Sequence, residues 1–230
     1  MKLSVLIPVY NEAATLEEAL KRLMNVSFPC ELEIVVVDDG SVDASPEILR
    51  GISDTRLRSY RHDNNRGKGA AVTTALHEAT GDFAVMYDSD LEYAAEDLLN
   101  LLEPIMAGEA EVVFGTRSFG SHTAYSFWYV VGNKVVTMTA NVLFNTWISD
   151  LETCYKMMPV PLFRELDIRS KRFGMEPEIT GKLLRRGIRP HEVAISYRAR
   201  SRAEGKQLTW RDGVKAILIL LRIRVGSGLR

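Results

Sequence analysis

Residues 32–41 read LEIVVVDDGS, and apart from Glu33 this stretch is apolar until its carboxyl end, where two acids, a glycine and a serine follow. A short continuous apolar run of this kind is typical of a strand covered on both faces, as in parallel sheets. Asp-Gly favours a turn directly after it. The stretch therefore predicts a buried parallel strand with acidic side chains at its carboxyl end.

The flanking sequence alternates between strand and helix patterns. We expect strands at Leu3–Val9, Leu57–Arg61, Phe83–Tyr87 and Glu111–Gly115, and helices at Thr15–Val26, from Ser45, at Lys68–Ala79 and at Asp97–Met106. Thr15 and Glu18 have capping-box spacing, and Ser45-Pro46 is a good N-cap and first-turn pair. This alternation predicts an α/β fold with a mostly parallel central sheet flanked by helices.

The second half of the chain is less regular. We expect a long amphipathic segment at Ser126–Thr146, strands near Tyr155–Val160 and Glu192–Tyr197, a helix near Pro177–Arg186 and an amphipathic helix from Thr209. There is no internal repeat, linker or low-complexity tract, so the sequence predicts one domain over 1–230.

Composition excludes several classes of protein. The net charge is -1, which argues against a general nucleic-acid binder. The 2 cysteines are too few for a disulfide framework or a zinc site and favour a reducing compartment. The N-terminal run is too short for a signal peptide, and apolar stretches are too interrupted for a spanning helix, so we expect neither.

Polar motifs follow three of the expected strands, at the edge where ligands bind in open α/β sheets. They are PVYNE (8–12), DDGS (38–41) and DSD (88–90). Asp88 and Asp90 offer the hard oxygen ligands that suit Mg²⁺ or Mn²⁺, ions that usually bridge substrate phosphates. The alternative is an acidic patch at a helix N-terminus, since Glu92, Glu96 and Asp97 follow.

Two further motifs carry positive charge. NRGKGAA (65–71) opens a helix with two glycines, which would let phosphate approach backbone N–H groups beside Lys68. RARSRAEGK (198–206) places arginines alternately on an extended stretch, a good fork for a phosphate. A solvated surface strand is the alternative for the second motif.

These blocks, with GTR (115–117), SDLETCYKM (149–157) and FGMEPEI (173–179), together resemble the dolichyl-phosphate mannose/glucose synthase branch of the family 2 glycosyltransferases. The resemblance covers essentially the whole chain, in order. It implies a GT-A fold and an inverting enzyme that moves a hexose from a nucleoside-diphosphate sugar, of GDP-mannose or UDP-glucose type, to polyprenyl or dolichyl phosphate.

The resemblance also implies roles for individual residues. Asp88 and Asp90 would bind Mg²⁺ or Mn²⁺, with Glu92 as a third candidate ligand in a position where relatives often have glutamine. Arg117 and Arg202 would join the acidic pair in catalysis. The donor nucleotide would contact Pro8, Tyr10, Glu12, Asp38, Asp39, Lys68 and Ser89, and the acceptor phosphate Arg117, Arg200, Arg202 and Lys206. Residues 1–118 would bind the donor, 119–208 the acceptor, and 209–230 would form an amphipathic tail.

A lipid acceptor requires access to a bilayer surface. The aromatic run Tyr125–Tyr129 and the tail VKAILILLRIRVGSGLR, which combines Ile217, Leu218, Leu220 and Leu221 with basic residues, favour contact with an anionic membrane. Packing within the domain, or a dimer contact, is the alternative. We expect a cytoplasmic protein, peripheral at the cytoplasmic face of a membrane, with a membrane-protein partner or a second copy of the chain as further candidate partners.

Three other functions compete with this hypothesis. The first is a family 2 transferase acting on a saccharide hydroxyl, for which Asp150, Glu152, Glu176 or Glu178 would supply a general base. The second is a nucleotidyltransferase, disfavoured because Pro8–Glu12 has neither glycine nor cation. The third is a non-catalytic domain that binds nucleotide or lipid, disfavoured by the intact acidic pair and basic cluster.

Overall fold

The computed structural model describes residues 1–122, 126–172, 174–199 and 210–226. In this part of the chain seven strands form one sheet in the order β3-β2-β1-β4-β6-β5-β7. Their bounds are β1 (Lys2–Val9), β2 (Glu31–Asp38), β3 (Leu57–Arg61), β4 (Phe83–Met86), β5 (Val113–Thr116), β6 (Lys156–Pro159) and β7 (His191–Ala194). All neighbours are parallel except β6, which runs antiparallel to β4 and β5.

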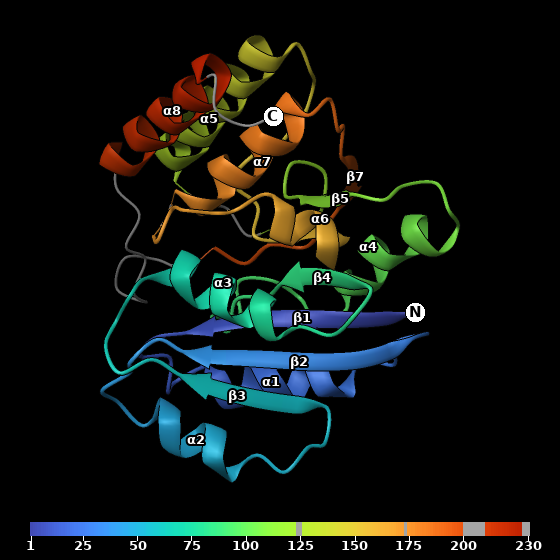
Figure 1. Ribbon diagram of the computed structural model, residues 1–230, viewed down its shortest axis with the longest axis vertical. Helices are drawn as coiled ribbons and strands as arrows, with labels where there is room; N and C mark the ends of the chain where they lie inside the picture. Colours follow the sequence, from blue (N-terminus) through green and yellow to red (C-terminus); the bar gives the residue numbers. More distant parts are fainter. Residues whose placement is uncertain (123–125, 173, 200–209, 227–230) are drawn as a thin grey trace.

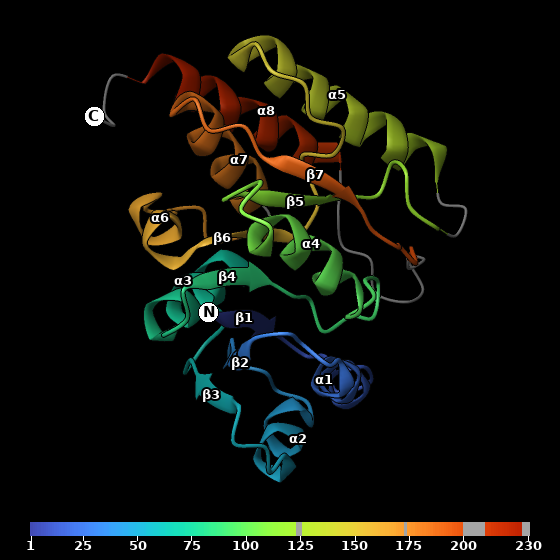
Figure 2. The same cartoon turned by 90° about the vertical axis from the view of Figure 1, so that its right-hand side faces the viewer.

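Helices cover both faces of the sheet. They are α1 (Leu16–Asn25), α2 (Ser45–Gly51), α3 (Lys68–Glu78), α4 (Asp97–Met106), α5 (Phe127–Phe144), α6 (Val160–Glu165), α7 (Met175–Arg185) and α8 (Trp210–Val225). Figure 2 shows α3 and α6 on one face and α1 and α4 on the other. In both Figure 1 and Figure 2, α5 and α8 lie side by side beyond the β5–β7 end of the sheet.

The predicted α/β architecture is confirmed, including each predicted strand with its ends shifted by a few residues. Two local predictions are wrong. Thr15 forms no capping bond, because its hydroxyl donates to the Glu12 carboxylate at 3.1 Å instead. Ser45 is the first residue of α2 and not its N-cap, and its hydroxyl accepts from the Glu12 backbone N–H at 3.1 Å. Both side chains therefore bind the loop after β1, and neither caps a helix.

The register of the parallel strands fixes where their polar ends meet. Val9 of β1 pairs with Asp38 of β2, and Asp38 pairs with Arg61 of β3. From Leu3 to Ile7, and again from Ile34 to Val37, every apolar side chain is fully buried. The two strands are thus anchored in the core along their length, and their carboxyl ends open at a common edge.

Glu33 is a buried carboxylate on β2 that ties this core to the α3–β4 turn. It accepts hydrogen bonds from the Ser4 hydroxyl at 2.9 Å, from the Thr80 backbone N–H at 2.8 Å and from the Thr80 hydroxyl, and Lys2 Nζ lies 3.2 Å away. Burial alone would raise the pKa of Glu33, but these partners outweigh it and hold the pKa at about 2.

We expect the free energy of unfolding to depend on Glu33 at acid pH. Its folded pKa is depressed, so its contribution is complete above about pH 4.5 and is lost as pH falls toward 2. Glu33→Gln should therefore flatten the pH dependence in this window by up to about 1.4 kcal/mol per pH unit. Urea denaturation from pH 2.5 to 7 measures this slope. Glu31→Gln, whose side chain is 68% exposed on the same strand, should keep the wild-type slope; equal slopes in all three proteins would refute the assignment.

Candidate active site

The acidic pair lies where β4 leaves the sheet. Asp88 and Asp90 follow the buried Tyr87, and the Asp90 carboxylate accepts the Glu92 backbone N–H at 3.0 Å. Leu91, which lies between Asp90 and Glu92, has a φ of 61°. This left-handed conformation is rare for a bulky residue and often marks a functional turn. The Ser89 hydroxyl is buried without a hydrogen-bond partner among the described residues. The turn thus presents two carboxylates on a constrained backbone.

Lys68, the first residue of α3, connects this turn to α7. Its ammonium lies 2.8 Å from Asp88 Oδ2 and 3.0 Å from Glu176 Oε1. Burial would lower the pKa of Lys68, but the two carboxylates outweigh it and the pKa lies well above its ordinary value. The same ammonium holds the pKa of Glu176 below its usual range despite burial. Lys68 therefore stays charged beside the acidic pair.

The glycines of NRGKGAA serve a different purpose from the one predicted. A Cβ at Gly67, where φ is 98°, would lie 2.1 Å from the Lys171 carbonyl oxygen, and one at Gly69 would lie 1.9 Å from that of Ser170. The Gly69 N–H donates to the Lys171 carbonyl at 3.0 Å. The expected phosphate cradle of backbone N–H groups is therefore wrong, because neighbouring backbone fills the space, and Lys68 carries the positive charge of this motif.

Asp39 is the residue that shapes the loop before α3. Its carboxylate is 2% exposed and accepts the backbone N–H groups of Arg66 at 2.9 Å and Gly67 at 2.7 Å. The buried His62 lies 2.6 Å from the same carboxylate through Nδ1 and 2.9 Å from the Thr74 hydroxyl through Nε2. Asp39 thus positions the segment that delivers Lys68.

The loop after β1 carries the remaining predicted donor contacts. Tyr10 is 42% exposed, while Pro8 and Glu12 are half-buried. Asp38 is buried; its Oδ1 accepts the Ser41 N–H at 2.9 Å and its Oδ2 lies 3.3 Å from Arg61 Nε. Tyr10 is thus the most exposed of these side chains at the carboxyl edge.

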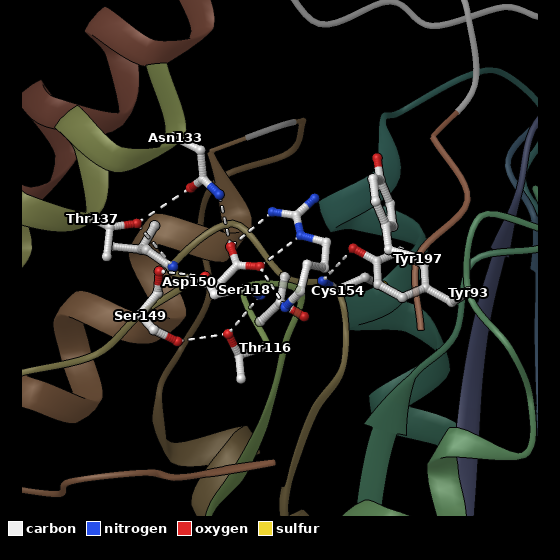
Figure 3. Close-up of polar contacts among 12 residues, drawn as sticks. Tyr93, Thr116, Ser118, Asn133, Thr137, Ser149, Asp150, Cys154 and Tyr197 are labelled. Carbon is white, nitrogen blue, oxygen red and sulfur yellow. Dashed lines mark hydrogen bonds and ion pairs between the residues drawn. The ribbon is translucent and has the colours of Figure 1, made fainter. Parts of the chain in front are cut away.

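Arg117 is held in a buried ion pair with Asp150. Nε lies 2.6 Å and Nη2 2.8 Å from the two carboxylate oxygens, and Asn133 Nδ2 adds a bond of 2.9 Å to Asp150 (Figure 3). The guanidinium also stacks on Tyr197 at 4.9 Å. Burial would raise the pKa of Asp150, but Arg117 holds it far below its usual range. Asp150 therefore fixes the orientation of Arg117.

The Glu92 carboxylate is bonded to a residue that follows β7. Its carboxylate is 9% exposed and accepts the Tyr197 hydroxyl at 2.7 Å, and its backbone carbonyl accepts the Arg198 N–H at 2.8 Å. Tyr197 also packs 5.4 Å from Tyr93, and the Tyr93 hydroxyl accepts the Cys154 N–H at 3.3 Å (Figure 3). Glu92 thus ties the acidic turn to the segment after β7.

Three predicted acceptor residues, Arg200, Arg202 and Lys206, lie outside the described residues. The sequence does not predict the roles that three further residues of the site have, namely Glu176, His62 and Asn133. For Glu176 the sequence suggests only a general base, although FGMEPEI, the block that contains it, is part of the family resemblance. No local signal pairs it with Lys68, because the two lie far apart in the chain.

The acidic pair suits a divalent metal only with help from a substrate. Among residues 1–122, 126–172, 174–199 and 210–226, no group of three or more His, Cys, Asp or Glu side chains is arranged to hold a metal. Mg²⁺ is commonly bound by one or two carboxylates together with substrate phosphates. Asp88, whose side chain is 19% exposed, and Asp90 on the constrained turn fit this donor set.

The mixed sheet with an acidic turn after a central strand defines a GT-A glycosyltransferase fold. Residues 4–167 match the family model "Glycosyl transferase family 2", and the chain belongs to this family. A crystal structure of glucosyl-3-phosphoglycerate synthase from Mycobacterium tuberculosis, in complex with Mn²⁺, UDP and phosphoglyceric acid, is similar with a TM-score of 0.74. At 18% identity, over 97% of this chain and 78% of that one, the likeness concerns the fold.

Two relatives are similar in sequence. Dolichol-phosphate mannosyltransferase from Pyrococcus furiosus is 36% identical over 136 residues, covering 59% of this chain and 35% of the relative. UDP-N-acetylglucosamine–dolichyl-phosphate N-acetylglucosaminyltransferase from Methanococcus voltae is 24% identical over 248 residues, covering 98% and 97%. The match covers only 20% of a Haloferax volcanii glycosyltransferase, so the chain spans less than half of some relatives.

Proposed function

We propose that this chain transfers a hexose from a nucleoside-diphosphate sugar to polyprenyl or dolichyl phosphate, with inversion at the anomeric carbon and with Mg²⁺ or Mn²⁺. The observation that carries the proposal is the grouping of Asp88, Lys68 and Glu176 at the carboxyl edge of the sheet, with Asp90 on the same turn as Asp88. Both named relatives use a dolichyl phosphate according to their names, which supports the choice of acceptor.

The chemistry of a phosphate acceptor suits the residues present. A phosphate monoester is already an anion at neutral pH, so its attack on the anomeric carbon needs no strong general base. What the reaction needs is positive charge around two anions that otherwise repel each other. Lys68, whose pKa is raised, supplies such charge beside the donor diphosphate. Arg117, oriented by Asp150, supplies it toward the acceptor.

A metal ion held by Asp88 and Asp90 would neutralise charge on the leaving nucleoside diphosphate. Before the ion binds, the two carboxylates repel each other. The Lys68 ammonium, 2.8 Å from Asp88, offsets part of this repulsion. In this proposal Arg200, Arg202 and Lys206 complete the acceptor site from the sequence segment after Arg198.

A transfer assay with a panel of donors tests the proposal. The protein is incubated with polyprenyl phosphate and one labelled sugar nucleotide at a time, with Mg²⁺, Mn²⁺ or EDTA. We expect label in the lipid phase with one class of donor and only with metal. Release of free sugar without lipid product would exclude the proposed acceptor, and no consumption of any donor by folded protein would exclude the transferase.

Two apolar stripes on α5 and α8 support a peripheral position at a bilayer. None of the helices in the described ranges combines the length and apolar character needed to cross a membrane. The tail prediction needs correction at Leu220, which is fully buried and faces the domain. The exposed stripes, which we call the α5/α8 face, contain Trp128, Val135, Met138 and Val142 of α5 and Trp210, Val214, Leu218, Leu221 and Val225 of α8.

The α5/α8 face combines the features of an interfacial membrane surface. Trp128 and Trp210 are 77% and 76% exposed, and aromatic rings favour the level of the lipid headgroups. Arg222 and Arg224 near the end of α8 add positive charge that anionic lipid attracts. We therefore propose that anionic phospholipid covers this face and brings the active site to its lipid acceptor.

Replacing both tryptophans of the α5/α8 face by serine should weaken binding to anionic phospholipid vesicles by at least about tenfold, since each buried apolar side chain contributes roughly 1.5–3 kcal/mol. Vesicle flotation measures the bound fraction. Val42→Ser is the matched control, because Val42 is 86% exposed but lies near α2, at the other end of the sheet from α5 and α8 (Figure 1). Equal flotation of the two variants would contradict the assignment.

A further inference from the structure

Glu152 differs from every residue around it in the segment that leads into β6. All the other residues from Ile148 to Met158 are buried, and Glu152 alone in this stretch is partly exposed. Its neighbour Asp150 is committed to Arg117, and Thr153 is fully buried. No group in the described residues donates a hydrogen bond to the Glu152 carboxyl. This is a carboxyl with capacity for a partner from outside the protein.

Lys156 fixes the backbone on both sides of Glu152. Its fully buried ammonium donates to the Leu151 carbonyl at 2.9 Å and to the Thr153 carbonyl, the two residues that flank Glu152. It also lies 4.9 Å from the centre of the Phe114 ring. A buried ammonium is costly unless it is well bonded, so this arrangement constrains the direction of the residue between the two carbonyls.

The charges around Glu152 come from three elements and from its own loop. Glu176 lies on α7, Lys156 on β6 and Arg117 directly after β5, while Asp150 precedes it in the chain. Burial and Glu176 raise the pKa of Glu152, Lys156 and Arg117 oppose them, and the result is about 7. Such a carboxyl exchanges its proton near neutral pH and can accept or donate a hydrogen bond.

Glu152 is near the position that the proposed donor would occupy. Glu176, which raises its pKa, is the same residue that binds Lys68, and Lys68 binds Asp88 of the acidic pair. The transferred sugar is joined directly to the diphosphate, so its ring hydroxyls lie next to the groups that hold that diphosphate. Glu152 is partly exposed beside Glu176 and has no hydrogen-bond donor among the described residues, so its carboxyl is placed to meet the sugar and not the nucleoside.

We propose that Glu152 binds a hydroxyl of the transferred hexose and so selects the donor sugar, and that Lys156 is its positioning residue. The proposal rests on the proposed function, since it requires a nucleoside-diphosphate sugar as donor. It assigns recognition of the sugar to the segment DLET (150–153), and other residues bind the acceptor.

Calorimetric binding without acceptor tests the proposal. The donor that the transfer assay selects and the matching nucleoside diphosphate are titrated, with Mn²⁺, into wild type, Glu152→Ala and Glu152→Gln. We expect Glu152→Ala to lower the affinity for the sugar nucleotide by about tenfold, which is the contribution of one good hydrogen bond. The affinity for the nucleoside diphosphate should not change. Affinity for the sugar nucleotide should rise from pH 6 to 8 in wild type, because a carboxylate is the stronger acceptor, and stay flat in Glu152→Gln.

Lys156→Met separates positioning from simple destabilisation. It should reduce the preference for sugar nucleotide over nucleoside diphosphate in the wild-type background and have no further effect on that preference in Glu152→Ala. Equal losses for both ligands, or no loss in Glu152→Ala, would overturn the role of Glu152 while donor binding by wild type still stands. Wild type that binds neither ligand would overturn the proposed function itself.

Discussion

Asp90→Ala is expected to abolish sugar transfer, by on the order of a thousandfold or more, while leaving the fold intact. Asp90 lies on a turn at the sheet edge, and its carboxylate accepts the Glu92 backbone N–H at 3.0 Å. Loss of one of two carboxylates from the acidic pair removes half of the protein's ligands for a divalent ion. Initial transfer rates with Mn²⁺ measure the effect, and circular dichroism verifies the fold.

The control for Asp90 is an exposed acid away from the site. Glu109→Ala removes the same type of charge from the exposed turn between α4 and β5. This turn precedes a strand, whereas Asp90 follows one, so the variant should keep wild-type transfer. Calorimetry adds a second readout, because Asp90→Ala should also lose the Mn²⁺-dependent part of nucleoside-diphosphate binding. Normal turnover in Asp90→Ala would end the assignment of a metal site to this pair.

Asp150→Ala is expected to lower the free energy of unfolding by about 3–5 kcal/mol, the usual cost of leaving one member of a buried ion pair without its partner. Asp150 is 1% exposed and Arg117 15%, and the carboxylate accepts from Arg117 Nε, Nη2 and backbone N–H and from Asn133. Removing it leaves a buried guanidinium and the Asn133 amide without an acceptor. Urea denaturation at pH 7 measures the loss.

A double variant separates stability from function at this pair. Arg117→Met with Asp150→Leu removes both charges, so it should recover much of the lost stability, because an apolar pair of similar volume is often neutral. It should still fail to transfer sugar if Arg117 faces the acceptor phosphate. A loss below about 1 kcal/mol in Asp150→Ala would mean that water reaches the guanidinium and that the pair is not a buried one.

The sheet and the edge that carries the site follow from local patterns in the sequence. The continuous apolar runs Val5–Val9 in β1 and Ile34–Val37 in β2 predict buried parallel strands, and the acids that end β2 must lie at the carboxyl edge. The position of Asp88 and Asp90 after β4 is predictable for the same reason. These inferences need only the strand direction and the pattern of a few adjacent residues.

The particular bonds that side chains and backbone form on folding were not predictable in this way. Gly67 and Gly69 look like a phosphate loop, but the backbone of Ser170 and Lys171 fills the space above them. Thr15 and Glu18 have capping-box spacing, yet Glu12 offers the Thr15 hydroxyl a nearer acceptor. The Lys68–Glu176 and Lys156–Leu151 bonds depend on how α7 and the loop before β6 pack, which no local period encodes.

A pair of matched acceptors tests most directly whether the acceptor of this enzyme is a phosphate on a lipid. The donor that labels lipid is offered with Mn²⁺ to a polyprenyl phosphate and to the polyprenol of the same chain length, in the same detergent. We expect transfer to the phosphate and none above background to the alcohol, because Lys68 and Arg117 supply positive charge that suits an anionic nucleophile. Equal transfer to the two lipids, or transfer to a saccharide hydroxyl with none to the phosphate, would contradict it.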